Sequence, residues 1–153
     1  MILVCGFWFV VCGYFYIRTP IIYANISKFQ DLEIWQKARI LSKEIFEYIE
    51  TGGFKRDYKL IEQINAASGS IMYNIAEGFE RGSRLEFINF LSYAKGSTGE
   101  VKSQLITALD RKFLDQEKFD YFYNKADELT KQLTSFINYL NRSSIKGQKF
   151  KNR

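Results

Sequence analysis

The chain has 153 residues, a formal net charge of +5 and no histidine, and both of its cysteines, Cys5 and Cys12, lie near the N-terminus. One domain is usual for this length, which is enough to bury a hydrophobic core. Because histidine is the commonest metal ligand and general base, its absence excludes a histidine-containing di-iron site and nucleophiles of the Ser-His and Cys-His types. We expect a protein that is not an enzyme, with no catalytic or metal-ligating residues, no cofactor and no small-molecule substrate.

The positive charge is concentrated at the C-terminus. Five basic residues and no acidic residue follow Asn141, namely Arg142, Lys146, Lys149, Lys151 and Arg153. Without these five, basic and acidic residues are equal in number. We interpret residues 142–153 as a disordered basic tail, since they are polar and lack an apolar period. The pI therefore describes this tail and does not indicate a basic face on the body.

Residues 1–17 form an apolar run without a charged side chain. Its length is at the lower limit for a membrane-spanning helix. No basic residue precedes it and no cleavage motif follows it, which argues against a cleaved signal peptide. We interpret residues 1–27 as an extension outside the folded domain, as an upstream start site would produce, with a weak membrane anchor as the alternative. We expect a cytoplasmic protein.

Two helices are predicted in the first half of the body, because apolar residues recur there every three or four positions. The first begins near Gln30 or Asp31, with Asp31 as N-cap or first-turn acid, and ends at Gly52-Gly53. The second covers residues 57–79. Within it, Gly69 indicates a close approach by another helix, since glycine inside a helix is unfavourable. The apolar stripes of the two helices are Leu32, Trp35, Ala38, Leu41, Ile45, Tyr48 and Ile49, and Leu60, Ile64, Ala67, Ile71 and Ile75.

Two further helices follow. The third begins at Ser83, where Ser83 and Glu86 match a capping box, and runs to about Lys112. The fourth begins after Asp115, a predicted N-cap, and runs to about Asn141. Small residues line one face of the third helix at Ser92, Gly96, Gly99 and Ser103. Tight packing inside one bundle and a subunit interface are the two interpretations of this face.

Four amphipathic helices with short connections predict an all-α, antiparallel, up-down-up-down four-helix bundle over residues 28–141. The second and third helices form a hairpin around the turn at residues 78–82. Next to this turn, Glu77 and Arg81 are spaced to pair on one helix face. With Asn74 and Gly78 they form either a polar recognition spot or a structural cluster in which hydrogen bonds fix the turn and Gly78 supplies a permissive backbone.

Three segments resemble the bacterial 23S ribosomal RNA intervening sequence proteins, a family similar to the accessory variability proteins of diversity-generating retroelements. They are residues 29–38 (FQDLEIWQKA), residues 70–78 (SIMYNIAEG) and residues 81–100, with Arg81, Ser83, Glu86, Phe87, Phe90, Leu91, Ala94, Gly96, Ser97 and Glu100. The resemblance covers about residues 28–140. It implies a four-helix bundle that assembles into a ring-like homopentamer without known enzymatic activity. The retroelement relatives bind a reverse transcriptase and nucleic acid through a basic surface.

Two function hypotheses follow. The first is a non-enzymatic, self-assembling scaffold or interaction protein. The second is an accessory factor that binds RNA or DNA, or a protein such as a reverse transcriptase. The chain departs from the family where two arginines often follow the Gln63-Ile64 pair, because Asn65 and Ala66 stand there. The candidate nucleic-acid contacts are Lys55, Arg56, Lys59, Arg81, Arg84, Arg111, Lys112, Arg142, Lys146, Lys149 and Lys151.

Overall fold

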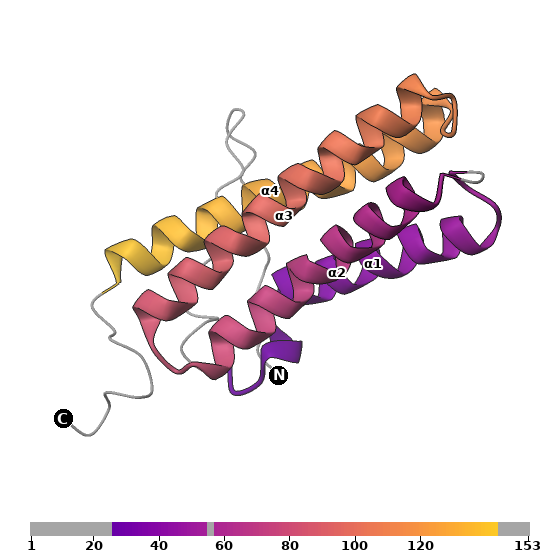
Figure 1. Ribbon diagram of the computed structural model, residues 1–153. Coiled ribbons are helices and arrows are strands. Elements are labelled where there is room, and N and C mark those ends of the chain that lie inside the picture. Colours follow the sequence, from indigo (N-terminus) through magenta and orange to yellow (C-terminus); the bar gives the residue numbers. More distant parts are fainter. Residues whose placement is uncertain (1–25, 55–56, 144–153) are drawn as a thin grey trace, which may run out of the picture.

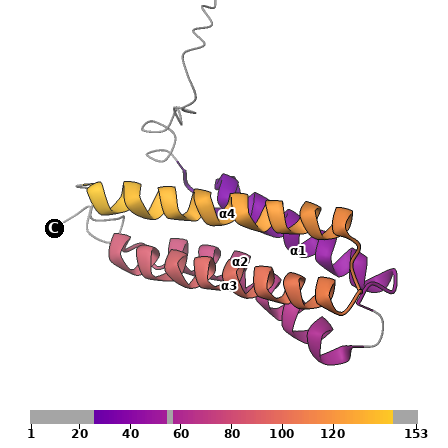
Figure 2. The same ribbon diagram turned by 90° about the horizontal axis from the view of Figure 1, so that it is seen from above.

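The computed structural model describes residues 26–54 and 57–143. Almost all of the predicted N-terminal extension and of the predicted tail lies outside these residues. The elements are the short 3-10 helix η2 (Phe29–Asp31) and four α-helices: α1 (Glu33–Glu50), α2 (Tyr58–Glu80), α3 (Arg84–Asp110) and α4 (Gln116–Arg142). The four helices run side by side along one long axis (Figures 1 and 2), and the described residues contain no strand. The prediction of an all-α four-helix bundle is confirmed.

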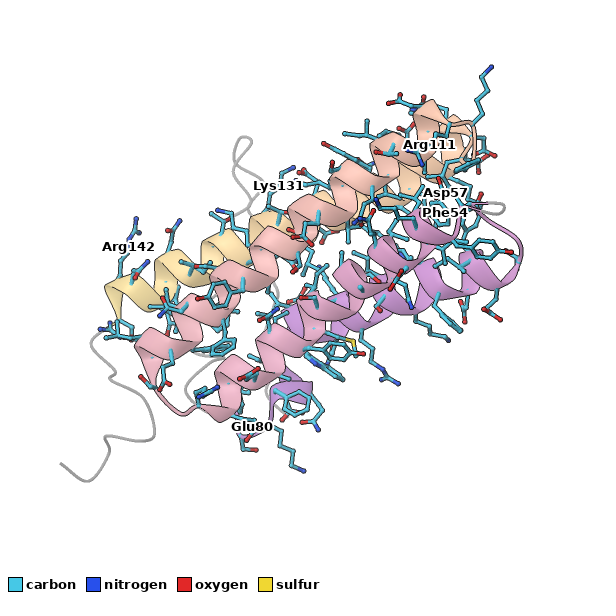
Figure 3. All side chains as sticks on the ribbon, in the orientation of Figure 1. Phe54, Asp57, Glu80, Arg111, Lys131 and Arg142 are labelled. Carbon is cyan, nitrogen blue, oxygen red and sulfur yellow. The ribbon has the colours of Figure 1, made fainter. Side chains whose placement is uncertain are left out.

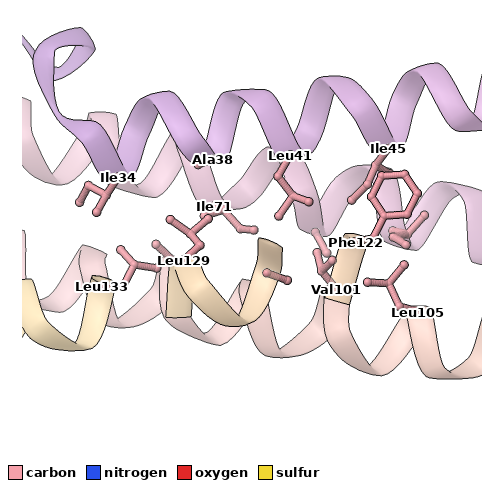
Figure 4. Packing of buried hydrophobic residues seen from close by; sticks show 14 of the residues in the cluster. Ile34, Ala38, Leu41, Ile45, Ile71, Val101, Leu105, Phe122, Leu129 and Leu133 are labelled. Atoms are coloured by element: carbon pink, nitrogen blue, oxygen red, sulfur yellow. The ribbon is translucent and has the colours of Figure 1, made fainter. Parts of the chain in front are cut away.

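The core is the space that the four apolar stripes enclose, and Figure 4 shows how they meet. Each helix packs on the next one in sequence, and α1 also packs on α4. Residues that are almost completely buried come from every helix, among them Ile45, Ile71, Val101 and Leu133. Phe54, in the loop after α1, is also buried and packs against Tyr48 with ring centroids 5.4 Å apart. It therefore closes one end of the core.

Each pair of consecutive helices is joined by one pair of hydroxyl side chains. Their oxygens are 3.4 Å apart for Ser42 and Ser68, 3.0 Å for Ser70 and Ser97, and 2.8 Å for Thr98 and Thr130. Buried hydroxyls need partners, so these pairs favour one alignment of neighbouring helices. Between α1 and α4 the corresponding links are ion pairs, from Lys37 to Glu128 at 2.6 Å and from Lys125 to Glu44 at 2.5 Å.

The helix starts agree only partly with the predicted caps. The carboxylate of Asp115, a predicted N-cap, accepts a hydrogen bond from the backbone amide of Lys118. Asp57, for which no cap was predicted, accepts one from the amide of Leu60 in the same way. Asp31 is not an N-cap of α1, because it lies in η2 and Leu32 occupies that position. Ser83 does occupy the N-cap position of α3, but its side chain makes no capping hydrogen bond. The half of the predicted capping box in which the side chain of Ser83 accepts a hydrogen bond from a backbone amide of the first turn is therefore not formed.

Two predictions about glycines in α2 are wrong. Gly69 is not approached by another helix, because the ring of Tyr73, one turn along the same helix, fills the space beside it. Gly78 was expected to supply an unusual backbone, but it lies in regular helix and the positive φ of the turn, 66°, is at Gly82. A Cβ at Gly78 would lie 2.5 Å from Cβ of Phe90. Gly78 thus lies where α2 and α3 approach each other closely.

Candidate functional site

One side of α3 points away from the core, and we call it the outward face of α3. It consists of Leu85, Asn89, Ser92, Gly96, Gly99, Ser103 and Ile106, all of which are exposed. A Cβ placed on Gly96 or Gly99 would have no neighbour within 4 Å. The interpretation of these small residues as packing inside one bundle is therefore wrong. The subunit interface, the other interpretation, stays a prediction.

Large apolar side chains lie at the ends and edge of this face. Leu85 and Tyr93 are 65% and 61% exposed, and Ile106 is 45% exposed. Tyr73, on the neighbouring α2, is 64% exposed and lies over Gly69. These four residues were missed in the sequence, although a large apolar residue outside the buried stripe of its helix is a readable signal. Exposed apolar side chains beside a face of small residues are compatible with an interaction surface.

The turn between α2 and α3 carries an ion-pair cluster. Arg81 donates a hydrogen bond to Glu77 at 2.6 Å, and another nitrogen of its guanidinium lies 4.0 Å from Glu86. The hydrogen bond to Glu77 and the charge of that residue raise the pKa of Arg81 above its ordinary value. The guanidinium also lies 5.3 Å from the centre of the Phe90 ring. Asn74 is not part of this cluster, because its amide donates to the backbone and hydroxyl oxygens of Ser70.

Two of the candidate nucleic-acid contacts are used inside the bundle. Arg84 donates to the carbonyl oxygens of Leu140, at 3.1 Å, and Ser143, so it satisfies the end of α4. Arg111 pairs with Asp57, the N-cap of α2. Figure 3 shows this pair near Phe54, at one end of the bundle. Both guanidiniums therefore have a structural role inside the bundle.

Arg81, another candidate, is held by Glu77 and Glu86, whereas three further candidates are less constrained. Lys59, Lys112 and Arg142 are exposed, and none forms a salt bridge with another described residue. They lie at both ends of the bundle, Lys59 near the start of α2, Lys112 after α3 and Arg142 at the end of α4. Lys55, Arg56, Lys146, Lys149 and Lys151 lie outside the described residues.

A groove of about 440 Å³ runs between α2 and α3 near the Asp57–Arg111 pair. Its wall includes Gln104, whose Oε1 is shielded from solvent and has no hydrogen-bond partner among the described residues. The other lining residues are Asp57, Lys59, Leu60, Gln63, Glu100, Ser103, Thr107 and Arg111. Charges of both signs line the groove, so it does not form a basic channel. In the part of the chain that the structure describes, no three metal-ligating side chains gather and no helix is long and apolar enough to span a membrane.

Comparison with known proteins assigns the chain to a family. Residues 30–135 match the family model described as 23S rRNA-intervening sequence protein. The chain belongs to this family. A solved structure supports the fold: a protein of unknown function from the S23 ribosomal protein family of Bacteroides thetaiotaomicron has a TM-score of 0.64 and 24% sequence identity, and the match covers 68% of this chain and 97% of that chain. No match was found among curated proteins.

In this 23S rRNA-intervening sequence protein, Asn65 and Ala66 stand where the family resemblance implies two arginines. Asn65 and Ala66 are both exposed on α2. Arginines at these positions would therefore have projected from the surface, where phosphate groups can reach them. In this chain the part of α2 around Asn65 and Ala66 carries no cation.

Proposed function

We propose that this 23S rRNA-intervening sequence protein is a non-catalytic scaffold that assembles with copies of itself, five in number, through the outward face of α3. The observation that supports this most directly is the pair Gly96 and Gly99. A glycine in a helix interior lowers stability by about 1 kcal/mol relative to alanine. No group within the described chain approaches either residue. A helix from another copy would be able to approach α3 closely at these two positions, because glycine has no side chain.

The surroundings of the two glycines fit the same proposal. Small residues let two helix backbones approach closely. Leu85 and Ile106, at the ends of the face, supply apolar area that a partner would remove from water. The number five rests on the family resemblance and not on the geometry of one chain.

The experiment is a comparison of the full chain with the double variant Gly96→Ala/Gly99→Ala by light scattering on a sizing column, with thermal unfolding of the same samples. The wild-type protein should have the mass of about five chains. The double variant should shift toward the monomer because two methyl groups separate the helices. Ser135→Thr is the matched control, since it adds a methyl group to an exposed position of a different helix, α4. A monomeric wild-type protein, or a double variant with unchanged mass, would contradict the proposal.

A second candidate, an accessory factor that binds RNA or DNA, rests on the exposed cations. Lys59, Lys112 and Arg142 form no salt bridge among the described residues, and further basic residues follow Arg142 in the sequence. Changing Lys59, Lys112 and Arg142 to glutamine together with the deletion of residues 144–153 should abolish binding to a mixed RNA and DNA ladder, and in the wild-type protein binding should weaken with salt because each phosphate contact releases counterions. Binding that survives these changes, or that does not weaken with salt, would argue against it.

A further inference from the structure

The groove between α2 and α3 carries two charges of opposite sign that do not neutralise each other. Lys59, on α2, and Glu100, on α3, both line it and are exposed, and neither forms a salt bridge with another described residue. Asp57 and Arg111, which also line the groove, are already paired with each other. The described residues of the groove therefore offer one unpaired ammonium and one unpaired carboxylate.

These two charges lie toward opposite ends of the groove. Helices α2 and α3 are antiparallel, and Asp57 pairs with Arg111 at one end of the bundle (Figure 3). Lys59 lies two residues from this pair along α2, whereas Glu100 lies eleven residues from it along α3. At a rise of about 1.5 Å per residue, the two charged residues are about 12–14 Å apart along the helix axes.

Two glutamines line the groove between these charges. Gln63, on α2, and Gln104, on α3, make no side-chain hydrogen bond to another described residue, and Oε1 of Gln104 is shielded from solvent. A shielded acceptor without a donor is unfavourable. The last torsion of a glutamine side chain is broad, so a rotation can turn this oxygen toward a donor in the groove. Leu60, which is 3% exposed, adds an apolar part to the wall.

An ammonium group matches the end of the groove that carries Glu100. Glu100 and Gln104 are four residues apart, so their side chains are neighbours on one face of α3. An ammonium group has three donors and a positive charge, so it can bond the Gln104 oxygen and the carboxylate at the same time. Water can donate to the oxygen but brings no charge to the carboxylate. A carboxylate group matches the other end, where the ammonium of Lys59 is unpaired among the described residues.

We infer that this groove binds a small zwitterion, with its ammonium group at Glu100 and Gln104 and its carboxylate at Lys59. An extended dipeptide has its charged ends about 7 Å apart. The long, exposed side chains of Lys59 and Glu100 cover the rest of the distance, and the amide of Gln63 faces the peptide group. An ω-amino acid of the same length offers the same two charges without the peptide group. The volume of about 440 Å³ admits either molecule. The groove lies within one chain, so this inference does not depend on self-assembly.

Four molecules of nearly equal length test the charge requirement by isothermal titration calorimetry of the full chain. Glycylglycine and δ-aminovalerate are zwitterions, cadaverine carries two ammonium groups and adipate carries two carboxylates. Both zwitterions should bind at concentrations up to about 10 mM, and cadaverine and adipate about five-fold more weakly or not at all, because one end of each meets a like charge. Tighter binding of glycylglycine than of δ-aminovalerate would identify a dipeptide as the ligand, and the reverse order an ω-amino acid. Equal binding of all four molecules, or no binding of either zwitterion, would overturn the inference.

Substitutions in the groove test the individual contacts. Glu100→Gln and Lys59→Gln should each weaken binding of the tighter zwitterion about two- to five-fold, since each removes one charge contact. Gln104→Leu should weaken it similarly but leave thermal unfolding of the ligand-free protein unchanged, because its Oε1 has no partner to lose among the described residues. Lys95→Gln is the matched control, an exposed lysine of α3 that does not line the groove. Wild-type affinity in both Glu100→Gln and Lys59→Gln would refute the assigned contacts and with them the inference.

Discussion

Glycine occurs on the two sides of α3 for different reasons: Gly78 of α2 faces the inward side, whereas Gly96 and Gly99 of α3 itself lie on the outward side. On the inward side, α3 is held so close to α2 that a Cβ on Gly78 would lie 2.5 Å from Cβ of Phe90. On the outward side, Gly96 and Gly99 face open space within the chain. Glycine at the first place is required by the fold. At the other two places the fold gains nothing from glycine, so the reason has to lie outside the single chain.

The contrast teaches that a run of small residues does not by itself reveal what approaches it. All three glycines lie in helix, so local conformation does not separate them. What separates them is whether a neighbouring element already fills the space. Alanine substitution reports this directly, because a methyl group clashes where a neighbour is present and improves helix propensity where none is.

Gly78→Ala should have the largest effect. The added methyl group meets the Cβ of Phe90, which is fixed to its own backbone, so α2 and α3 would have to move apart. We expect the free energy of unfolding to fall by about 2 kcal/mol, in the usual range for overpacked sites. Urea unfolding followed by circular dichroism measures it. An unchanged or higher stability would show that the two helices are not held at this distance.

Thr98→Val should have the next largest effect. Thr98 is completely buried on the inward side of α3, and its hydroxyl oxygen is 2.8 Å from that of Thr130 on α4. Removing one partner should lower the free energy of unfolding by about 1 kcal/mol. In the double variant Thr98→Val/Thr130→Val the further loss should be small, because the contact between the two hydroxyls is already gone and Thr130 otherwise bonds, among the described residues, only the carbonyl oxygen of Ala126 on its own helix. Two additive losses in a double-mutant cycle would mean that the hydroxyls act separately.

Most of the fold could be predicted from the sequence because its signals are local. Apolar periodicity located all four helices, and Asp115 located the start of α4 within a residue. Phe54 was assigned to a loop and not to the core, since a single apolar residue outside a helix has no period to place it. Gly78 was similarly attributed to the nearby turn, because its contact with α3 depends on how two helices are spaced.

The candidate site was less accessible from the sequence. Arg84 and Arg111 look like free surface cations, but their partners, Leu140 and Asp57, lie 56 and 54 residues away in the chain. No pattern in the sequence reports such contacts. The small residues on α3 were recognised as one face, yet periodicity could not say that the face points outward.

Gly96→Ala and Gly99→Ala should have smaller effects of opposite sign to that of Gly78→Ala. Each should raise the free energy of unfolding of the single chain by about 0.5–1 kcal/mol, because alanine is the better helix former and nothing opposes its methyl group. Thermal unfolding at a concentration too low for assembly measures this gain. A loss of stability at either position would place a neighbour on the outward side of α3 within the chain, and would remove the contrast between the two sides.

Asp127→Asn should have the smallest effect. It removes the ion pair with Lys102, which lies on α3 between the inward and the outward side. Asp127, on α4, accepts hydrogen bonds from Lys131 and Lys102, and these lower its pKa from the ordinary value of 3.8. A lowered pKa in the folded state means that the stabilisation is present above pH 3.8 and is lost as the pH falls through the folded value. The wild-type protein should therefore be more stable than Asp127→Asn near neutral pH, by less than in the preceding cases because surface ion pairs contribute little. This difference should vanish in acid.

The matched control for this pH dependence is Asp110→Asn, an exposed residue that forms no salt bridge among the described residues. Lys102 lies next to Ser103, a residue of the outward face of α3. An assembly that covers this face would therefore remove further water from the Lys102–Asp127 pair. A pair that is less screened interacts more strongly. The loss of stability at acid pH should then differ between the assembled wild-type protein and the monomeric Gly96→Ala/Gly99→Ala variant. Identical acid profiles in the two proteins would show that this edge of α3 stays in water in the assembly.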